Sequence, residues 1–120
     1  MVRLENHLGT IDISHEFLVN LVGGTAVNCF GVAGMAPTSV SQGLRGYLTG
    51  KRGQKELDRG IRVRYLRQKL TIDLHIIVTY GMNISAVVQS ITNKVRYTVE
   101  ETTGIPVHRV NVFVDGMHTE

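Results

Sequence analysis

Two neighbouring runs of alternating apolar and polar residues constrain the fold of this chain most. The first run is IRVRY, residues 61–65, and the second extends over residues 69–80. A period of two is typical of a strand with one buried and one exposed face. Because only a short step around Arg67 and Gln68 separates the runs, they predict an antiparallel hairpin. The step lacks Asn-Gly, so the sequence leaves the turn type open.

The second run divides its side chains between two faces. One face carries Leu70, Ile72, Leu74, Ile76, Val78 and Tyr80, and the other carries Lys69, Thr71, Asp73, His75, Ile77 and Thr79. We therefore expect the first set to face a core and the second set to face away from it.

Amphipathic helices are expected on either side of this hairpin. Ser14 is a suitable N-cap for the first, and Asn83 for the second, which we expect over residues 84–102 with a stop at Gly104. The first helix should bury one stripe, consisting of Phe17, Leu18, Leu21, Val22, Thr25, Ala26, Cys29 and Phe30. Two more strands are expected, over residues 10–13 and 107–114, and residues 40–48 are compatible with a short helix.

The predicted order is β-α-(short α)-β-β-α-β, which belongs to the α+β class. We expect a single domain over residues 1–120, with its core at about 9–117, and one sheet with both helices on one face. The nearest topology is a ferredoxin-like or related split βαβ arrangement. Strand order cannot be read from the sequence.

The stretch CFGVAGMAP, residues 29–37, contains the spacing Gly-x-x-Gly at Gly31 and Gly34. In KH domains such a loop between two helices binds a nucleic-acid backbone. This stretch has no Lys or Arg, and the segment expected before it is a single helix. We therefore interpret Gly31 as a helix C′ residue with positive φ, Gly34 as a point of close chain approach, and Pro37 as a helix stop.

The net charge of +3 is unevenly distributed. Nine Lys and Arg residues and two acidic residues lie between Arg45 and Lys69, so this segment carries +7 and the remainder carries −4. Such asymmetry indicates an anionic partner, such as nucleic acid, a phospholipid surface or an acidic protein face. The alternative is a solvated basic loop that keeps the protein soluble.

Composition restricts the cellular setting. The apolar content of 42% is typical of a globular protein, the longest apolar runs are short, and the first residues lack the apolar stretch of a secretory signal. Cys29 is the single cysteine, which excludes an internal disulfide. We expect a cytoplasmic protein.

Residues that would carry catalysis are sparse. The five histidines are His7, His15, His75, His108 and His118. None pairs with another histidine at i+2, i+3 or i+4, and Cys29 has no partner at metal-ligand spacing. Asp73 and His75 share a predicted face, which leaves a small enzyme built on that pair as a minor alternative. Glu100 and Glu101 are adjacent on a helix and point apart. We expect no enzyme activity, no metal and no cofactor.

The face of the sheet turned away from the helices is the candidate contact surface. Its candidate partner or anion contacts are Arg62, Arg64, Arg67, Lys69, Arg109 and Phe113. An RNA-binding sheet needs two or three aromatic side chains, and here Phe113 is the one clearly available. Ile77 and Phe113 would instead suit a docking or self-association surface, unless residues 38–58 fold over them.

Four segments together resemble the alkaline shock protein family of Gram-positive bacteria, also called the envelope stress response family. They are GTIDIS, VAGMA, RGIRVRYLRQKLTIDLHIIVTYGMNI and VEETTGIPVHRVNVFVDGM, which follow one another across most of residues 9–117. The family-matching positions Gly31, Val32, Gly34, Tyr80 and Gly81 are expected to be structural. The chain departs from the family in its first helix, at Gly23, Gly24, Asn28 and Cys29.

The resemblance implies a small cytoplasmic α/β domain without known catalytic residues or cofactor, linked to cell-envelope homeostasis. Some family members are held beneath the membrane by a small membrane-anchor protein, and self-assembly is suspected. We therefore expect a non-enzymatic protein that acts near the membrane by protein–protein interaction or by self-association as a homo-oligomer. We expect it to associate with the membrane only peripherally or through a partner. The alternative is a nucleic-acid-binding module that uses the basic 45–69 segment and the open sheet face.

Overall fold

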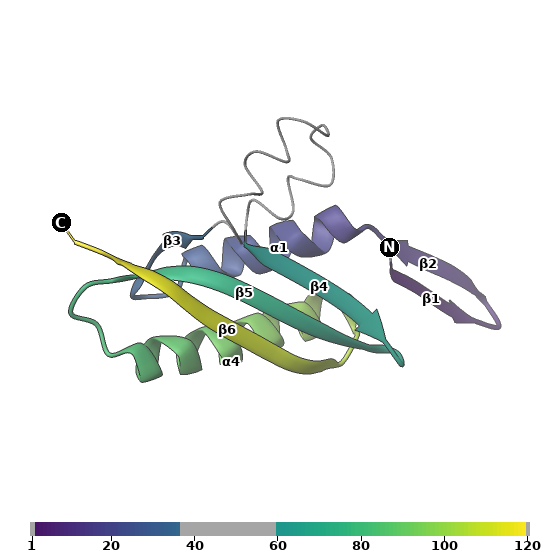
Figure 1. The fold of residues 1–120 in the computed structure, drawn as a ribbon. Coiled ribbons are helices and arrows are strands. Elements are labelled where there is room, and N and C mark those ends of the chain that lie inside the picture. Colours follow the sequence, from purple (N-terminus) through teal and green to yellow (C-terminus); the bar gives the residue numbers. More distant parts are fainter. Residues whose placement is uncertain (1, 37–59, 120) are drawn as a thin grey trace, which may run out of the picture.

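The structure, a computed structural model, describes residues 2–36 and 60–119 (Figure 1). Its main sheet is built around β5 (Lys69–Thr79), whose core-facing side chains are all buried. Tyr80, expected on the same face, lies beyond the end of the strand and is exposed, so that part of the prediction is wrong. Strand β4 (Ile61–Leu66) pairs antiparallel with its first half, and β6 (Val107–His118) pairs parallel along almost its whole length. The predicted hairpin is therefore confirmed, and β5 and β6 are direct neighbours.

The turn of the hairpin is of type I′. Arg67 and Gln68 both have positive φ, 53° and 64°, between the paired residues Leu66 and Lys69. This turn type matches the twist of the two strands, although neither residue is one of those that adopt it easily. The turn type that the sequence left open is thus decided by strand twist.

A short strand that the sequence does not predict shares an edge of β5 with β4. Strand β3 (Val32–Met35) pairs antiparallel with residues 76–78 of β5, so β3 and β4 lie end to end. Their meeting point is His75, whose carbonyl accepts from Ala36 N at 2.9 Å and whose N–H donates to Gly60 O at 2.8 Å. The short helix expected at 40–48 lies outside the described residues, as do residues 38–58.

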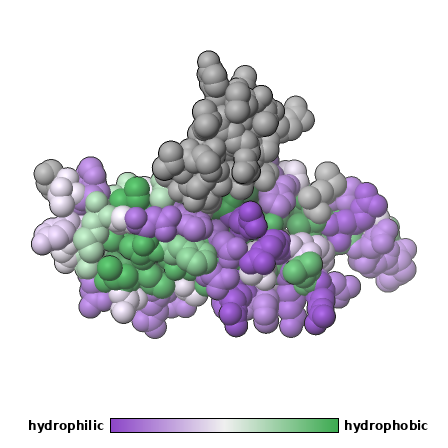
Figure 2. Space-filling model, viewed as in Figure 1, coloured by the Kyte–Doolittle hydropathy of each residue, from purple (hydrophilic) through white to green (hydrophobic). Residues whose placement is uncertain are grey.

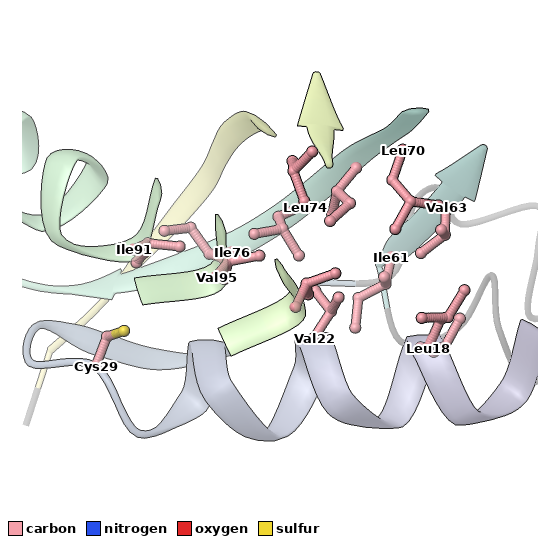
Figure 3. Packing of buried hydrophobic residues seen from close by; sticks show 14 of the residues in the cluster. Leu18, Val22, Cys29, Ile61, Val63, Leu70, Leu74, Ile76, Ile91 and Val95 are labelled. Carbon is pink, nitrogen blue, oxygen red and sulfur yellow. The ribbon is translucent and has the colours of Figure 1, made fainter. Parts of the chain in front are cut away.

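Both helices pack on one face of the main sheet, as predicted. Helix α1 (His15–Val27) and helix α4 (Ile84–Thr103) direct buried side chains at β5, and Figure 3 shows Val22, Ile91 and Val95 meeting Ile76 and its neighbours. Both predicted N-caps are present, because the side chains of Ser14 and Asn83 accept bonds from Phe17 N and Ala86 N at 3.0 Å. Gly104 ends α4 in the left-handed conformation.

Helix α1 is rotated and shorter than its pattern predicts. Phe17 and Phe30 are about half exposed, and Val19 is buried instead. The helix ends at Val27 with Asn28 as its cap, so Gly31 has the expected positive φ, 83°, but as the residue that leads into β3. The prediction of Gly31 as the helix C′ residue is therefore wrong, although its positive φ is confirmed. A Cβ at Gly34 would meet open space, so its interpretation as a close approach is also wrong, and Pro37 lies outside the described residues.

The first residues form a separate hairpin rather than part of a single sheet. Strand β1 (Val2–Asn6) pairs antiparallel with β2 (Gly9–Ile13), the strand predicted at 10–13. Arg3 and Asp12 form an ion pair of 2.8 Å across it. The buried side chain of Val2 attaches the hairpin to the core. The expected α+β class and ferredoxin-like type are confirmed, while the single sheet is corrected to two.

Candidate functional site: the open face of the main sheet

The main sheet turns one face away from both helices, and we call this the open face. In Figure 1 the strands lie in front of the helices, so Figure 2 looks onto it. Hydrophobic surface gathers over the C-terminal halves of β5 and β6, and hydrophilic surface lies over the β4 half. The open face carries Arg62, Arg64, Leu66, Lys69, Thr71, Asp73, His75, Ile77, Arg109, Asn111, Phe113 and Asp115.

A polar network crosses the three strands near the middle of this face. Asp73 accepts from Arg64 Nη2 at 3.0 Å and from Asn111 Nδ2 at 2.8 Å. Since the carboxylate is only 17% exposed, both bonds orient it firmly. Arg64, one of the predicted contact residues, therefore already serves a structural partner, whereas Arg62 forms no ion pair with a described residue.

A second group lies where the apolar half begins. The rings of His75 and Phe113 are stacked, with centroids 4.6 Å apart and planes 16° from parallel. His75 Nδ1 lies 2.9 Å from Asp115 Oδ2. Asp115 sits at an irregularity in the β5–β6 register, between Val114 and Gly116. Sequence reasoning missed Asp115 because the predicted strand stops at Val114, although the alternation continues through it.

Asp73 and His75 do not form the pair that the sequence allowed. Each has its own partners, Arg64 and Asn111 for Asp73, and Asp115 and Phe113 for His75. Adjacent same-face residues on one strand lie about 7 Å apart, so cross-strand neighbours are closer. These two side chains therefore lack the mutual geometry that a catalytic Asp–His pair would need.

The remaining predicted contacts gather at the hairpin end of the face. Arg67 and Lys69 line a hollow of about 590 Å³ together with Leu66, Thr71 and His108. Arg109 lies opposite Thr71 in the register. The fold thus brings Arg67, Lys69 and Arg109 to one region and leaves Phe113 further along the sheet. The basic residues between 45 and 59 lie outside the described residues.

Other chemically reactive groups do not add to this surface. Cys29 is buried, its Sγ lies 3.4 Å from Thr25 O, and burial raises the pKa of the thiol while Lys94 opposes that shift. Within residues 2–36 and 60–119, no three His, Cys, Asp or Glu side chains converge as a metal site would require. The helices of the same two ranges are too short or too polar to traverse a bilayer.

Fold and surface together define a small α+β domain whose sheet keeps one face uncovered by its described helices. A model of the alkaline shock protein family, whose function is described as cell envelope-related, matches residues 3–119. The chain belongs to this family, and the resemblance noted in its sequence is confirmed.

Two bacterial relatives match this chain along nearly its whole length. Protein YloU of Bacillus subtilis (strain 168) is 38% identical over 117 residues, covering 97% of this chain and 94% of YloU. Protein Spy1614 of Streptococcus pyogenes serotype M6 is 27% identical over 116 residues, covering 97% of this chain and 93% of its own. The similarity therefore extends over the complete domain rather than over one motif.

Solved structures share the fold at low sequence identity. The copper form of the MamM CTD has a TM-score of 0.50 and 17% identity, covering 85% of each chain. A manganese form of that domain has the same TM-score and identity, covering 86% of this chain and 99% of that one. This likeness supports the fold alone.

Proposed function

We propose that this protein is a non-enzymatic interaction protein on the cytoplasmic side of the cell envelope, and that its open face docks a protein partner. The family supports the envelope setting. The single observation that carries the docking role is the composition of the open face. A basic end and, further along the same sheet surface, an aromatic pair lie on a face that no described helix covers.

The two halves of this surface suit different parts of a partner. Phe113 is 45% exposed and Leu66 is 62% exposed, so apolar area is available for burial. Arg62, Arg67 and Lys69 supply positive charge around it, which favours a partner segment with acidic groups beside apolar ones. A small membrane-anchor protein with an acidic cytoplasmic segment has this chemistry.

Backbone strain at Arg67 supports the same proposal. A non-glycine residue in the left-handed region costs about 1–2 kcal/mol, and Arg67 and Gln68 are both there. Strain of this kind accompanies functional positions. A turn chosen for stability alone would carry Asn-Gly, so the arginine is best explained by a contact that it makes.

The proposal is tested by site-specific crosslinking in the cells that produce the protein. A photoreactive amino acid at position 113 should give one discrete adduct, recovered with the envelope fraction. The same group at position 97, where Tyr97 is exposed on α4, is the matched control and should not give it. Replacing Arg62 and Arg67 by Glu should abolish the adduct. Equal adducts at both positions, or none at 113, would contradict the proposal.

Binding of nucleic acid is the other function that the basic hollow permits. Its discriminating measurement is a titration with short RNA and DNA at two salt concentrations. Phosphate contacts would weaken with salt along a log–log line whose slope follows the number of phosphates neutralised. Because Phe113 is the one phenyl ring on the described open face, we expect no binding that survives moderate salt.

A further inference from the structure

The outer edge of β6 is the longest unpaired strand edge in the described part of the chain. β6 pairs with β5 alone, and β5 lies on only one of its sides. An edge strand presents a row of N–H and C=O groups that a further strand can satisfy. Such an edge is either protected or used for pairing.

Side chains of α4 protect this edge at the first residue of the strand. Arg96 Nη1 donates to Val107 O at 2.9 Å, and Glu100 Oε2 accepts from Val107 N at 2.8 Å. Beyond this point, residues 109–114 pair one by one with residues 71–76, between two irregularities in the register. The edge is therefore regular in the stretch that follows the protected residue.

We propose that a second copy of this chain pairs with this edge, β6 against β6 in antiparallel orientation, with Val112 on the two-fold axis. In this register Val112 lies opposite its own copy and Val110 lies opposite Val114. These three valines are only partly buried and pack against the core from the edge. Pairing makes them one continuous apolar row on the helix side of the joined sheet.

Charge complementarity selects this register. Arg109 and Asp115 are both on the open face and lie three residues on either side of Val112, so each faces the other's copy, twice in the dimer. Asp115 is 35% exposed and uses Oδ2 toward His75, which leaves Oδ1 for the arginine. A centre one residue earlier would place Arg109 against Phe113, and one residue later against Met117. Neither provides the ion pairs.

The joined sheet would place two open faces side by side, because both helices of each copy lie on the opposite face. This inference adds to the proposed function an identified self-association site that does not use Arg62 or Arg67. The two proposals therefore fail separately: a monomeric chain can still dock a partner at Phe113, and a dimer can form without that partner.

The test measures the mass of the full chain by sedimentation velocity from micromolar to submillimolar concentrations. Wild type should shift from 13.3 kDa toward twice that mass as concentration rises. Arg109→Asp alone and Asp115→Arg alone each place like charges opposite each other twice. Each should raise the dimer dissociation constant by about tenfold or more.

Mixing the two single variants gives the sharpest result. In a heterodimer of Arg109→Asp with Asp115→Arg, both cross-strand pairs join an aspartate to an arginine. The mixture should therefore dimerise more tightly than either single variant alone. The double variant exchanges both charges and should dimerise with itself, which also shows that the reversed residues are compatible with folding. Arg62→Asp, which reverses a charge on β4 at the other side of β5, is the matched control and should dimerise as wild type.

Two results would overturn the inference. One is a wild-type chain that stays monomeric at submillimolar concentration and low salt. The other is a dimer that withstands both single reversals. Hydrogen exchange gives an independent readout, because amides of residues 109–115 should gain protection with concentration in wild type and not in Arg109→Asp.

Discussion

Gly31 is a residue whose lack of a side chain the packing requires. Its φ is 83°, and a Cβ placed there would overlap Cγ2 of Val87 on α4. It lies where the chain passes from α1 to β3, and its carbonyl accepts from Thr79 N at 2.8 Å. One glycine thus combines a left-handed turn with a close approach of two elements.

Replacing Gly31 by Ala should lower the free energy of unfolding by about 2–4 kcal/mol, from the left-handed strain and the overlap with Val87. Gly24→Ala is the matched control, since Gly24 lies in α1 with open space around it. That change should raise stability by about 0.5–1 kcal/mol. Urea unfolding of both variants checks the pair, and equal effects would contradict the role of Gly31.

Cys29 gives the fold a dependence on alkaline pH. Burial raises the pKa of the thiol above its ordinary value of 9.0, so the folded state binds the proton more tightly than the unfolded state. The contribution of the protonated thiol to the free energy of unfolding is therefore complete below the pKa of the thiol in the unfolded state. It is lost as pH rises to the pKa of the thiol in the folded state. Between about pH 8 and pH 10, wild type should lose more stability than Cys29→Ala. Parallel losses in denaturant titrations would argue against this prediction.

The β4–β5 turn shows at the scale of an element how strand pairing overrides local preference. Six residue pairs from Ile61–Leu74 to Leu66–Lys69 hold the strands in register. They leave two residues to reverse the chain, and the right-handed twist requires positive φ at both. Arg67 and Gln68 accept that conformation although neither favours it.

Changing Arg67-Gln68 to Asn-Gly should therefore raise the free energy of unfolding by about 1–2 kcal/mol. Arg62→Asn removes a charge from the same hairpin without touching the turn, and should change stability by less than about 0.5 kcal/mol. Thermal and chemical unfolding measure both. If Arg67 contacts a partner, the Asn-Gly variant should also lose the position-113 crosslink. An unchanged free energy of unfolding in that variant would mean that the turn is not strained.

At the scale of the whole molecule, the ends of the two described ranges, Ala36 and Gly60, lie next to each other. Ala36 and Gly60 both hydrogen-bond the backbone of His75, and a Cβ on Gly60 would strike Ala36 O. The core cluster is assembled from both described ranges on either side of this junction. Because closing a short gap between adjacent ends has a small entropic cost, the fold does not need a long connection there.

A variant with residues 37–59 replaced by a short Gly-Ser bridge should therefore still fold. Its urea unfolding should be a single cooperative transition, as in the full chain. It also removes the basic residues from Arg45 to Arg59, so it separates their contribution to partner binding from that of the open face. Retention of the position-113 crosslink would support docking by the sheet. Loss of cooperative unfolding would show that the fold depends on the replaced residues.

Local patterns in the sequence determined the elements that local forces dominate. The alternation in 61–79 predicts the hairpin and its buried face. Ser14, Asn83 and Gly104 mark helix ends by side-chain and backbone preferences that act within one turn. The placement of Arg62, Arg109 and Phe113 on the open face also follows from alternation. Each of these signals concerns residues only a few positions apart.

Tertiary structure decided what depends on partners distant in sequence. Strand β3 exists because Val32–Met35 finds residues 76–78, and its four residues, one of them glycine, carry too weak a pattern to predict. The pairing of β5 with β6 unites His75 with Phe113 and Asp115, and likewise Asp73 with Asn111. Strand register and order arise from burial and hydrogen bonds summed over the whole sheet, and no local stretch encodes that sum.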